Sequence, residues 1–289
     1  MSPHRGLTSL LLAAVAIGSG AAQTGAAQTA RALAHYDLAA AAAWQERLPR
    51  DLAEISGLAF GPDGRLFAHG DERGIVWRYD LEHRRPAGRF GIGDEGRVIY
   101  ADFEDITVVG ERLFLVTGTG AIYEGRIAPD GQIGRAARRI QGLGRACEVE
   151  GMTWDPDTKA LLLLCKTTYT KLWKDHVVIL AVSPDTWRFE RRPRILVPHD
   201  RVERVTGEKR FSGSGLTRHP RTETLLLIAG PQRAFVEVGL KGEVLGGGRL
   251  DKDRHPQPEG IAIAPDLTLL ISDEAAKGSA AITAYAYRP

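Results

Sequence analysis

Five segments of the chain share one pattern, and this internal repeat limits the possible folds more than any other feature. Each segment has a polar or acidic residue, a glycine or aspartate anchor, an aliphatic residue, a tight turn and a strongly apolar run. The anchors are Gly57, Asp105, Gly151, Gly215 and Gly260, spaced by 48, 46, 64 and 45 residues. Repeats of this length are typical of units that stack on one another to bury a common core.

Each repeat predicts a strand, a turn and a second strand. Third strands are predicted at 75–79, 121–124, 177–182, 235–238 and 281–285, and one fourth strand at 194–197. Four-stranded repeats of this kind are the blades of a β-propeller, so we expect an all-β fold with five blades. A sixth blade in the 64-residue interval is the alternative, although its stretches 166–174 and 188–210 are predicted as loops. Residues before the first anchor and after the last are expected to close the ring.

The first residues form a separate unit. A short basic start leads into the apolar run from Leu7 to Ile17, followed by small residues with no charge until Arg31. This pattern predicts a secretory signal peptide cleaved after Ala22, Ala27 or Ala32. We therefore divide the chain into a signal peptide and short lead, 1–32, and a propeller domain, 33–289.

The expected location is the periplasm or the exterior of the cell. An uncleaved membrane anchor is the alternative, but a spanning helix needs about 20 apolar residues. The run from Leu7 to Ile17 is shorter than that, so we expect no transmembrane segment after cleavage.

The overall charge excludes a global attraction to nucleic acid. The chain has 38 basic and 36 acidic side chains, a formal charge of +2, so nucleic acid is not an expected partner. We expect a monomer with a small-molecule or envelope partner. The stretch 188–210 is locally basic, with eight Lys or Arg against four Asp or Glu. It is either a solvated loop or a patch for an anionic ligand or envelope surface.

The repeat motifs resemble the SdiA-regulated family of exported bacterial propellers. The resemblance covers about residues 35–289 and rests on Glu54-Ile-Ser-Gly-Leu, Phe103-Glu-Asp-Ile, Cys147-Glu-Val-Glu-Gly-Met with Leu162-Leu-Leu-Cys-Lys166, Ser214-Gly-Leu, and Gln257-Pro-Glu-Gly-Ile-Ala. It implies five blades and a bound calcium ion. At greater distance the chain is similar to NHL-type propellers and to phytase-like esterase propellers. Ser56 and Ser214 depart from the acidic pattern, which weakens the expected metal contribution of their blades.

Acidic residues near the anchors are the candidate metal ligands. Residues two apart on a strand face the same side, so acids at and before the anchors would converge if the first strands line a central channel. Crowded carboxylates need protonation, solvation, a salt bridge or a cation, and oxygen ligands suit calcium. The predicted ligands are Glu54, Glu104, Glu150 and Glu259. Asp102 and Glu148 are predicted either to contact these ligands without binding the metal or to lie at the channel mouth. Alternatively, these acids hydrogen bond to the backbone of neighbouring blades.

Asp71 and Asp273 end two second strands, and they are either solvated loop acids or residues of the channel mouth. At the mouth, a carboxylate beside calcium could act as a base that activates water toward an ester or phosphoester, with His69 or His176 as an acid. The sequence contains no His-Glu-x-x-His, Gly-x-Ser-x-Gly, Cys-x-x-Cys or phosphate-loop motif. Two functions therefore stay open. The first is a protein of the cell envelope that binds calcium and acts as a binding or scaffold protein, and the second is a calcium-dependent esterase or phosphoesterase.

The two cysteines, Cys147 and Cys165, flank one predicted hairpin. In an oxidising compartment they are expected to form a disulfide. If Trp154 pairs with Ala160, position 165 falls opposite 149, and a diagonal bond to position 147 needs a bulge or a register shift. The alternative is two buried free thiols.

Overall fold

The computed structural model describes residues 1, 31–39, 42–140, 142–143, 146–275 and 278–289. The predicted signal peptide, 2–30, lies outside the described residues. The first described element is a short 3-10 helix, η1 (Ala32–His35). In the described part of the chain, no helix is long and apolar enough to cross a membrane.

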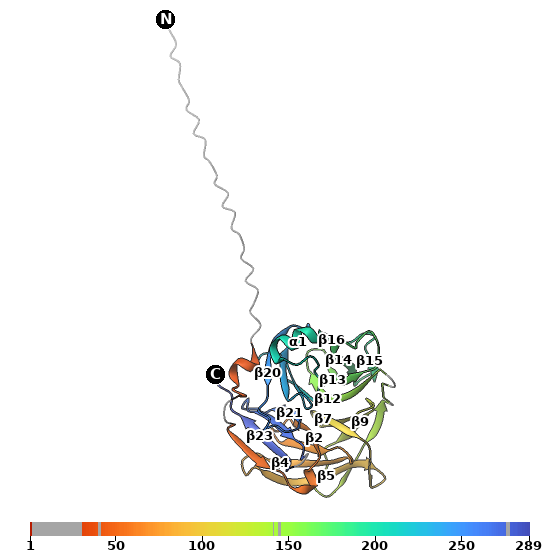
Figure 1. The fold of residues 1–289 in the computed structure, drawn as a ribbon. Helices are drawn as coiled ribbons and strands as arrows, with labels where there is room; N and C mark the ends of the chain where they lie inside the picture. The colour runs from red at the N-terminus through yellow and green to blue at the C-terminus, as the bar shows by residue number, and fades with distance from the viewer. Residues whose placement is uncertain (2–30, 40–41, 141, 144–145, 276–277) are drawn as a thin grey trace.

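Five sheets, antiparallel except for one parallel edge strand in blade 1, are arranged as blades around a common axis (Figure 1). From the axis outward, blade 1 has β2 (Ile55–Phe60), β3 (Leu66–Gly70), β4 (Ile75–Asp80) and β5 (Arg85–Asp94), with β6 (Arg97–Val98) and β10 (Ile133–Arg135) at its edge; blade 2 has β7 (Phe103–Val109), β8 (Arg112–Thr117), β9 (Ile122–Arg126) and β11 (Ala137–Ile140). Blade 3 has β12 (Cys147–Asp155), β13 (Ala160–Thr168) and β14 (His176–Ser183), edged by β15 (Arg188–Phe189) and β16 (Ile195–Pro198); blade 4 has β17 (Gly215–Arg218), β18 (Leu225–Ala229), β19 (Ala234–Val238) and β20 (Val244–Arg249); blade 5 has β21 (Pro258–Ile263), β22 (Leu269–Asp273), β23 (Ala281–Tyr285) and β1 (Trp44–Arg47).

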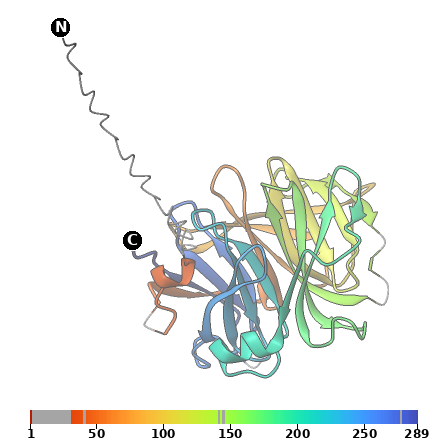
Figure 2. The same ribbon diagram turned by 90° about the horizontal axis from the view of Figure 1, so that it is seen from above.

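The prediction of five blades is confirmed, and the 64-residue interval does not hold a sixth sheet. Its additional residues form β15 and β16, which both pair with β14, and the helix α1 (His199–Thr206). The expectation of loops in this interval was therefore partly wrong. Strand β13 continues to Thr168, and the basic stretch 188–210 contains two short strands and a helix. Figure 2 shows α1 at the edge of the ring.

The ring closes as predicted, by pairing of an N-terminal strand with the last blade. Strand β1 runs antiparallel to β23, with Trp44 opposite Ala284. Ahead of β1, the backbone N–H groups of Ala32 and Leu33 donate to the buried carboxylate of Glu237 at 2.6 and 2.9 Å. Ala32 is itself fully buried.

The core lies between the blades, because both faces of each sheet are covered by its neighbours. Strand β13 illustrates the consequence for sequence, since Leu161 to Leu164 are all buried. Leu162 and Leu164 pack toward blade 4, whereas Leu161 and Leu163 pack toward blade 2. A continuous apolar run is what a strand buried on both faces requires.

Candidate functional site

A β-bulge lies next to the anchor of every inner strand. The pairing register shifts at Ser56, Glu104, Glu150 and Glu259, each directly before its anchor. In blade 4 the N–H of Ser214 donates to Ile228 O at 2.8 Å, and Gly215 also pairs with Ile228. A bulge leaves one residue outside the regular ladder and re-aims its side chain. The repeated motif therefore specifies five irregular positions around the axis, three of them acidic.

The three acidic bulge residues, Glu104, Glu150 and Glu259, form what we call the channel acid cluster. They come from β7, β12 and β21, which belong to three different blades. Glu150 is 6% exposed at its side chain, and Lys166 Nζ lies 2.9 Å from its Oε1. Lys166 stands at the end of β13, the strand paired with β12. The structure thus brings three of the four predicted metal ligands together around one lysine.

The acids of this cluster share too little positive charge to ionise together. Burial, then the nearby Glu150 carboxylate, raises the pKa of Glu104 to about 9. The same two causes raise the pKa of Glu259 to about 8. A protonated Glu104 can donate a hydrogen bond to the Glu150 carboxylate, which is paired with Lys166. Burial raises the pKa of Glu150 as well, and the ion pair with Lys166 opposes that rise. Near neutral pH the raised pKa values therefore favour the protonated forms of Glu104 and Glu259, and an added cation would favour loss of those protons.

Glu54, the fourth predicted ligand, does not join the cluster. It is exposed and lies just before β2, after the 3-10 helix η2 (Arg50–Leu52). The period-two argument paired it with Ser56, but the bulge at Ser56 breaks that alternation. Glu54 instead lines a pocket of about 400 Å³ at blade 1 with Asp71, Glu72 and Arg73. Burial, then Glu54, raises the pKa of Asp71 to about 6.

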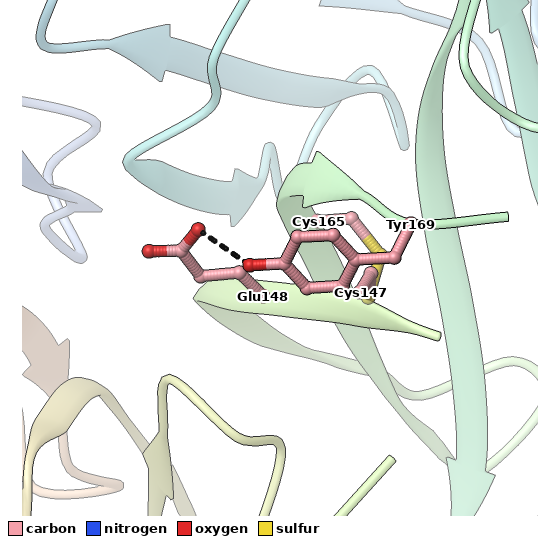
Figure 3. Close-up of a disulfide and its surroundings, with 4 residues drawn as sticks. All are labelled: Cys147, Glu148, Cys165 and Tyr169. Carbon is pink, nitrogen blue, oxygen red and sulfur yellow. Dashed lines mark hydrogen bonds between the residues drawn. A yellow bond between two sulfur atoms is a disulfide. The ribbon is translucent and has the colours of Figure 1, made fainter. Parts of the chain in front are cut away.

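The other predicted acids occupy different environments. Asp102 is exposed. Its carboxyl group and that of Glu104 both lie against Gly118, directly after β8. A Cβ atom at Gly118 would be 3.3 Å from Asp102 Oδ2 and 2.8 Å from Glu104 Oε1. Glu148 accepts a hydrogen bond from the Tyr169 hydroxyl at 3.4 Å (Figure 3). Asp273 is 1% exposed. Its carboxylate lies 2.7 Å from His255 Nδ1, so the structure places Asp273 inside the last blade and not at the channel mouth.

The two histidines predicted as acids are placed differently from each other. His69 is fully buried, and burial lowers its pKa to about 4. Its Nδ1 lies 2.8 Å from Gly70 O. His176 lies in a separate pocket at the end of blade 3. Among the described residues, neither histidine makes a hydrogen bond or ion pair with the channel acid cluster.

Two contacts of the site were not predicted from the sequence. Asp105, the one acidic anchor, accepts hydrogen bonds from Met152 N at 2.6 Å and Ile106 N at 2.8 Å, and so links blades 2 and 3. The available signal in the sequence was that this anchor is an aspartate, whereas the other four anchors are glycines. Ser214 makes the corresponding link between blades 4 and 5, donating to Pro258 O at 2.7 Å. Asp105 and Ser214 thus join neighbouring blades through hydrogen bonds to backbone groups.

The predicted disulfide between Cys147 and Cys165 is confirmed (Figure 3), with a Cα–Cα distance of 5.8 Å. The proposed register was wrong by one residue at the turn, where Asp155 pairs with Ala160. The bulge at Glu150 then shifts the ladder and brings Val149 opposite Cys165, as expected. The disulfide fixes the residues that directly precede Glu148 and Lys166.

The cluster fits a hard cation by its donor chemistry. Its ligands would be carboxylate oxygens, which hard cations prefer. Burial and then the neighbouring Glu150 raise the pKa values of Glu104 and Glu259, so full ionisation of the three acids would need positive charge beyond that of Lys166. Within the described ranges, no three acidic, histidine or cysteine side chains are gathered closely enough to hold a metal ion as they stand. Because Lys166 is bonded to Glu150, cation binding requires a local rearrangement of these side chains.

Comparison with known proteins identifies the fold only. No protein-family model matches the chain, and no curated protein sequence matches it. Among solved structures, glutaminyl cyclase of Myxococcus xanthus is 14% identical, with a TM-score of 0.56, and the match covers 85% of this chain and 94% of that one. A PQQ-bound aldose sugar dehydrogenase of Streptomyces coelicolor is 12% identical, with a TM-score of 0.54 over 84% of this chain and 98% of that one. These likenesses agree with a β-propeller.

Proposed function

We propose that the protein is an exported calcium-binding β-propeller, as the resemblance to the SdiA-regulated family implies, and that it acts as a binding or scaffold protein of the cell envelope. The observation that carries the metal proposal is the channel acid cluster, in which three buried or half-buried carboxyl groups from three blades share one lysine. The disulfide supports export, because such bonds persist in oxidising compartments.

In this proposal the calcium ligands would be Glu104, Glu150 and Glu259. The ion pair between Lys166 and Glu150 would break when calcium binds. Bound calcium supplies positive charge that lets all three carboxyl groups ionise. Glu104 and Glu259 give up their protons to solvent, and their blades become linked through one site. Calcium binding would therefore stabilise the propeller ring, and it would order the end of the channel where a ligand could bind.

Calcium titration of metal-stripped protein tests the proposal. At 100 times its dissociation constant, calcium should stabilise the fold by about 2.7 kcal/mol, visible as a higher melting temperature. Calorimetry at pH 7 in buffers of different ionisation enthalpy should show proton release, because the pKa values of Glu104 and Glu259 lie above 7.

Glu150→Gln keeps the side-chain shape but removes the central charge, so it should weaken calcium binding strongly. Glu82→Gln is the matched control, because Glu82 is an exposed acid outside the cluster. Unchanged melting in millimolar calcium would contradict the proposal, as would equal calcium affinity of the two variants.

A calcium-dependent esterase or phosphoesterase is the second candidate function. The observation that favours it is Asp71, whose pKa is raised to about 6 in an open pocket that also contains Arg50 and Arg73. A carboxylate with such a pKa can act as a general base near neutral pH. A screen of ester and phosphoester hydrolysis with and without chelator separates this function from binding alone.

A further inference from the structure

A second, basic pocket lies beside the channel, where β13 ends and the chain approaches β17. Its volume is about 430 Å³. Lys166, Lys174, Lys209 and Arg210 line it together with one carboxylate, that of Asp175. The nearest Lys174–Asp175 approach is 3.9 Å, and both side chains are largely exposed. The pocket therefore has an excess of positive charge, although the whole chain is almost neutral.

Blade 3 and α1 place two histidines in the wall of this pocket. The β14–β16 register sets His176 opposite Pro198, directly before His199, and His199 N donates to Asp175 O at 2.9 Å. The Nδ1 atoms of both His176 and His199 are buried and have no hydrogen-bond partner among the residues that the structure describes. Unpartnered buried polar atoms are costly and indicate a missing ligand or water. They are the second observation, independent of the lysines, that points to a ligand.

Lys209 and Arg210 are held at the rim by the end of α1. Gly207, with a φ of 77°, ends the helix, and the buried Phe211 fixes the chain after the two cations. Both cations are exposed, and across the described residues no ion pair joins either of them to an acid. Hydroxyl groups of Thr167, Thr168 and Ser212 add further possible donors.

We infer that this pocket binds the phosphate group of a phosphorylated ligand, with Lys209 and Arg210 as its main cationic contacts. Clustered N–H and O–H donors with several positive charges match a dianion with three terminal oxygens better than a carboxylate. The inference rests on the binding role proposed above and gives its ligand a chemical class. It does not require calcium in the channel, although Lys166 belongs to both sites.

The phosphate could belong to a soluble molecule or to a lipid headgroup. Leu172 and Tyr169, on the segment between β13 and β14, are 85% and 59% exposed. Apolar side chains beside a basic pocket would also contact a phospholipid surface. The experiment therefore includes both sources of the same group.

Inorganic phosphate is titrated into chelator-treated protein at pH 7.5, with ionic strength held constant by sodium chloride, and binding is followed by calorimetry. We expect saturable binding and a shift of the His176 and His199 imidazole resonances in NMR spectra. Lys209→Gln with Arg210→Gln should weaken phosphate binding at least about tenfold, since two charge-assisted contacts are lost. Arg192→Gln with Lys252→Gln removes the same charge from exposed positions outside the pocket and should change affinity less than about twofold.

Sedimentation with vesicles separates the two sources. Binding to phosphatidic acid vesicles but not to phosphatidylcholine vesicles, lost in the Lys209 and Arg210 variant, would assign the pocket to a lipid phosphate; binding of inorganic phosphate without vesicle binding would assign it to a soluble ligand. The inference is overturned if neither form binds, or if the two double variants bind equally. Because chelator is present throughout, failure here leaves the calcium titration as a separate test.

Discussion

His219 is a buried histidine whose neutral form is required by its surroundings. Its Nδ1 accepts hydrogen bonds from Arg221 N at 3.3 Å and Thr222 N at 3.1 Å, while Nε2 lies 3.1 Å from the Tyr36 hydroxyl. Tyr36 in turn donates to Leu267 O at 2.8 Å. Burial, then the nearby His35, lowers the pKa of His219 to about 4.

The lowered pKa of His219 predicts that the folded protein becomes less stable in acid. The unfolded chain binds a proton at His219 below about pH 6.5, whereas the folded protein does not until about pH 4. The contribution of neutral His219 to the free energy of unfolding is therefore fully present above pH 6.5 and is lost as the pH falls toward 4. His219→Asn retains an acceptor near the Nδ1 position but cannot titrate, so its melting temperature should fall less than that of the parent between pH 6.5 and 4.5. Parallel melting-temperature curves for the two proteins would contradict this prediction.

The sequence predicted the composition of the channel acid cluster better than its geometry. Glu104, Glu150 and Glu259 could be selected because each precedes an anchor, and the fold brings them together. Glu54 could not be excluded, because a strict two-residue alternation conceals the bulge at Ser56. The Lys166–Glu150 ion pair depends on side-chain reach across two strands, which repeat spacing does not specify. Whether the cluster binds calcium stays a prediction.

At the scale of elements, the sequence specified strands well and irregular segments poorly. Long apolar runs such as Leu161 to Leu164 are unambiguous, because burial on both faces needs them. Helix α1 was missed because it is short, half of its residues are charged, and only Val202 and Thr206 are buried. A helix held by one narrow contact face gives little apolar periodicity to detect.

The β12–β13 hairpin should depend on its disulfide for stability. Cys147 and Cys165 are 18 residues apart, and closing a loop of that size contributes about 3 kcal/mol in the chain-entropy model. For a chain of this size that corresponds to a fall of roughly 6–12 °C in melting temperature on reduction. Differential scanning calorimetry with and without dithiothreitol measures it. The double variant Cys147→Ser with Cys165→Ser should melt at the reduced value and show no response to reductant. A parent protein that reductant does not affect would refute the prediction.

At the scale of the whole molecule, the ring is held closed by the segment ahead of blade 1. Besides the β1–β23 pairing, Ala43 N donates to Ala284 O and Leu48 N donates to Ala280 O, each at 2.8 Å. Tyr36 and Leu38 of the same segment are buried in the core between blades 4 and 5. Figure 2 shows this red segment against the blue C-terminal strands.

A chain that begins at Leu48 should therefore be much less stable than one that begins at Arg31. It lacks the outer strand of blade 5 and leaves the edge of β23 unpaired. We expect its melting temperature to fall by at least roughly 10 °C, since several buried side chains are removed. Adding a synthetic peptide of residues 31–47 should recover part of the loss. Equal melting temperatures of the two chains would show that closure does not stabilise the ring.

The closing strand also determines when the protein can finish folding during synthesis. The partner of Trp44 is Ala284, so the last sheet stays incomplete until almost the entire chain has been made. Blades 1 to 4 each consist mainly of consecutive strands and can form in order as the chain emerges from its N-terminal end. A nascent chain or a prematurely terminated product keeps an open β-edge, which chaperones and proteases recognise in unfinished proteins. A fully translated chain can bury that edge with a strand made at the beginning of its own synthesis.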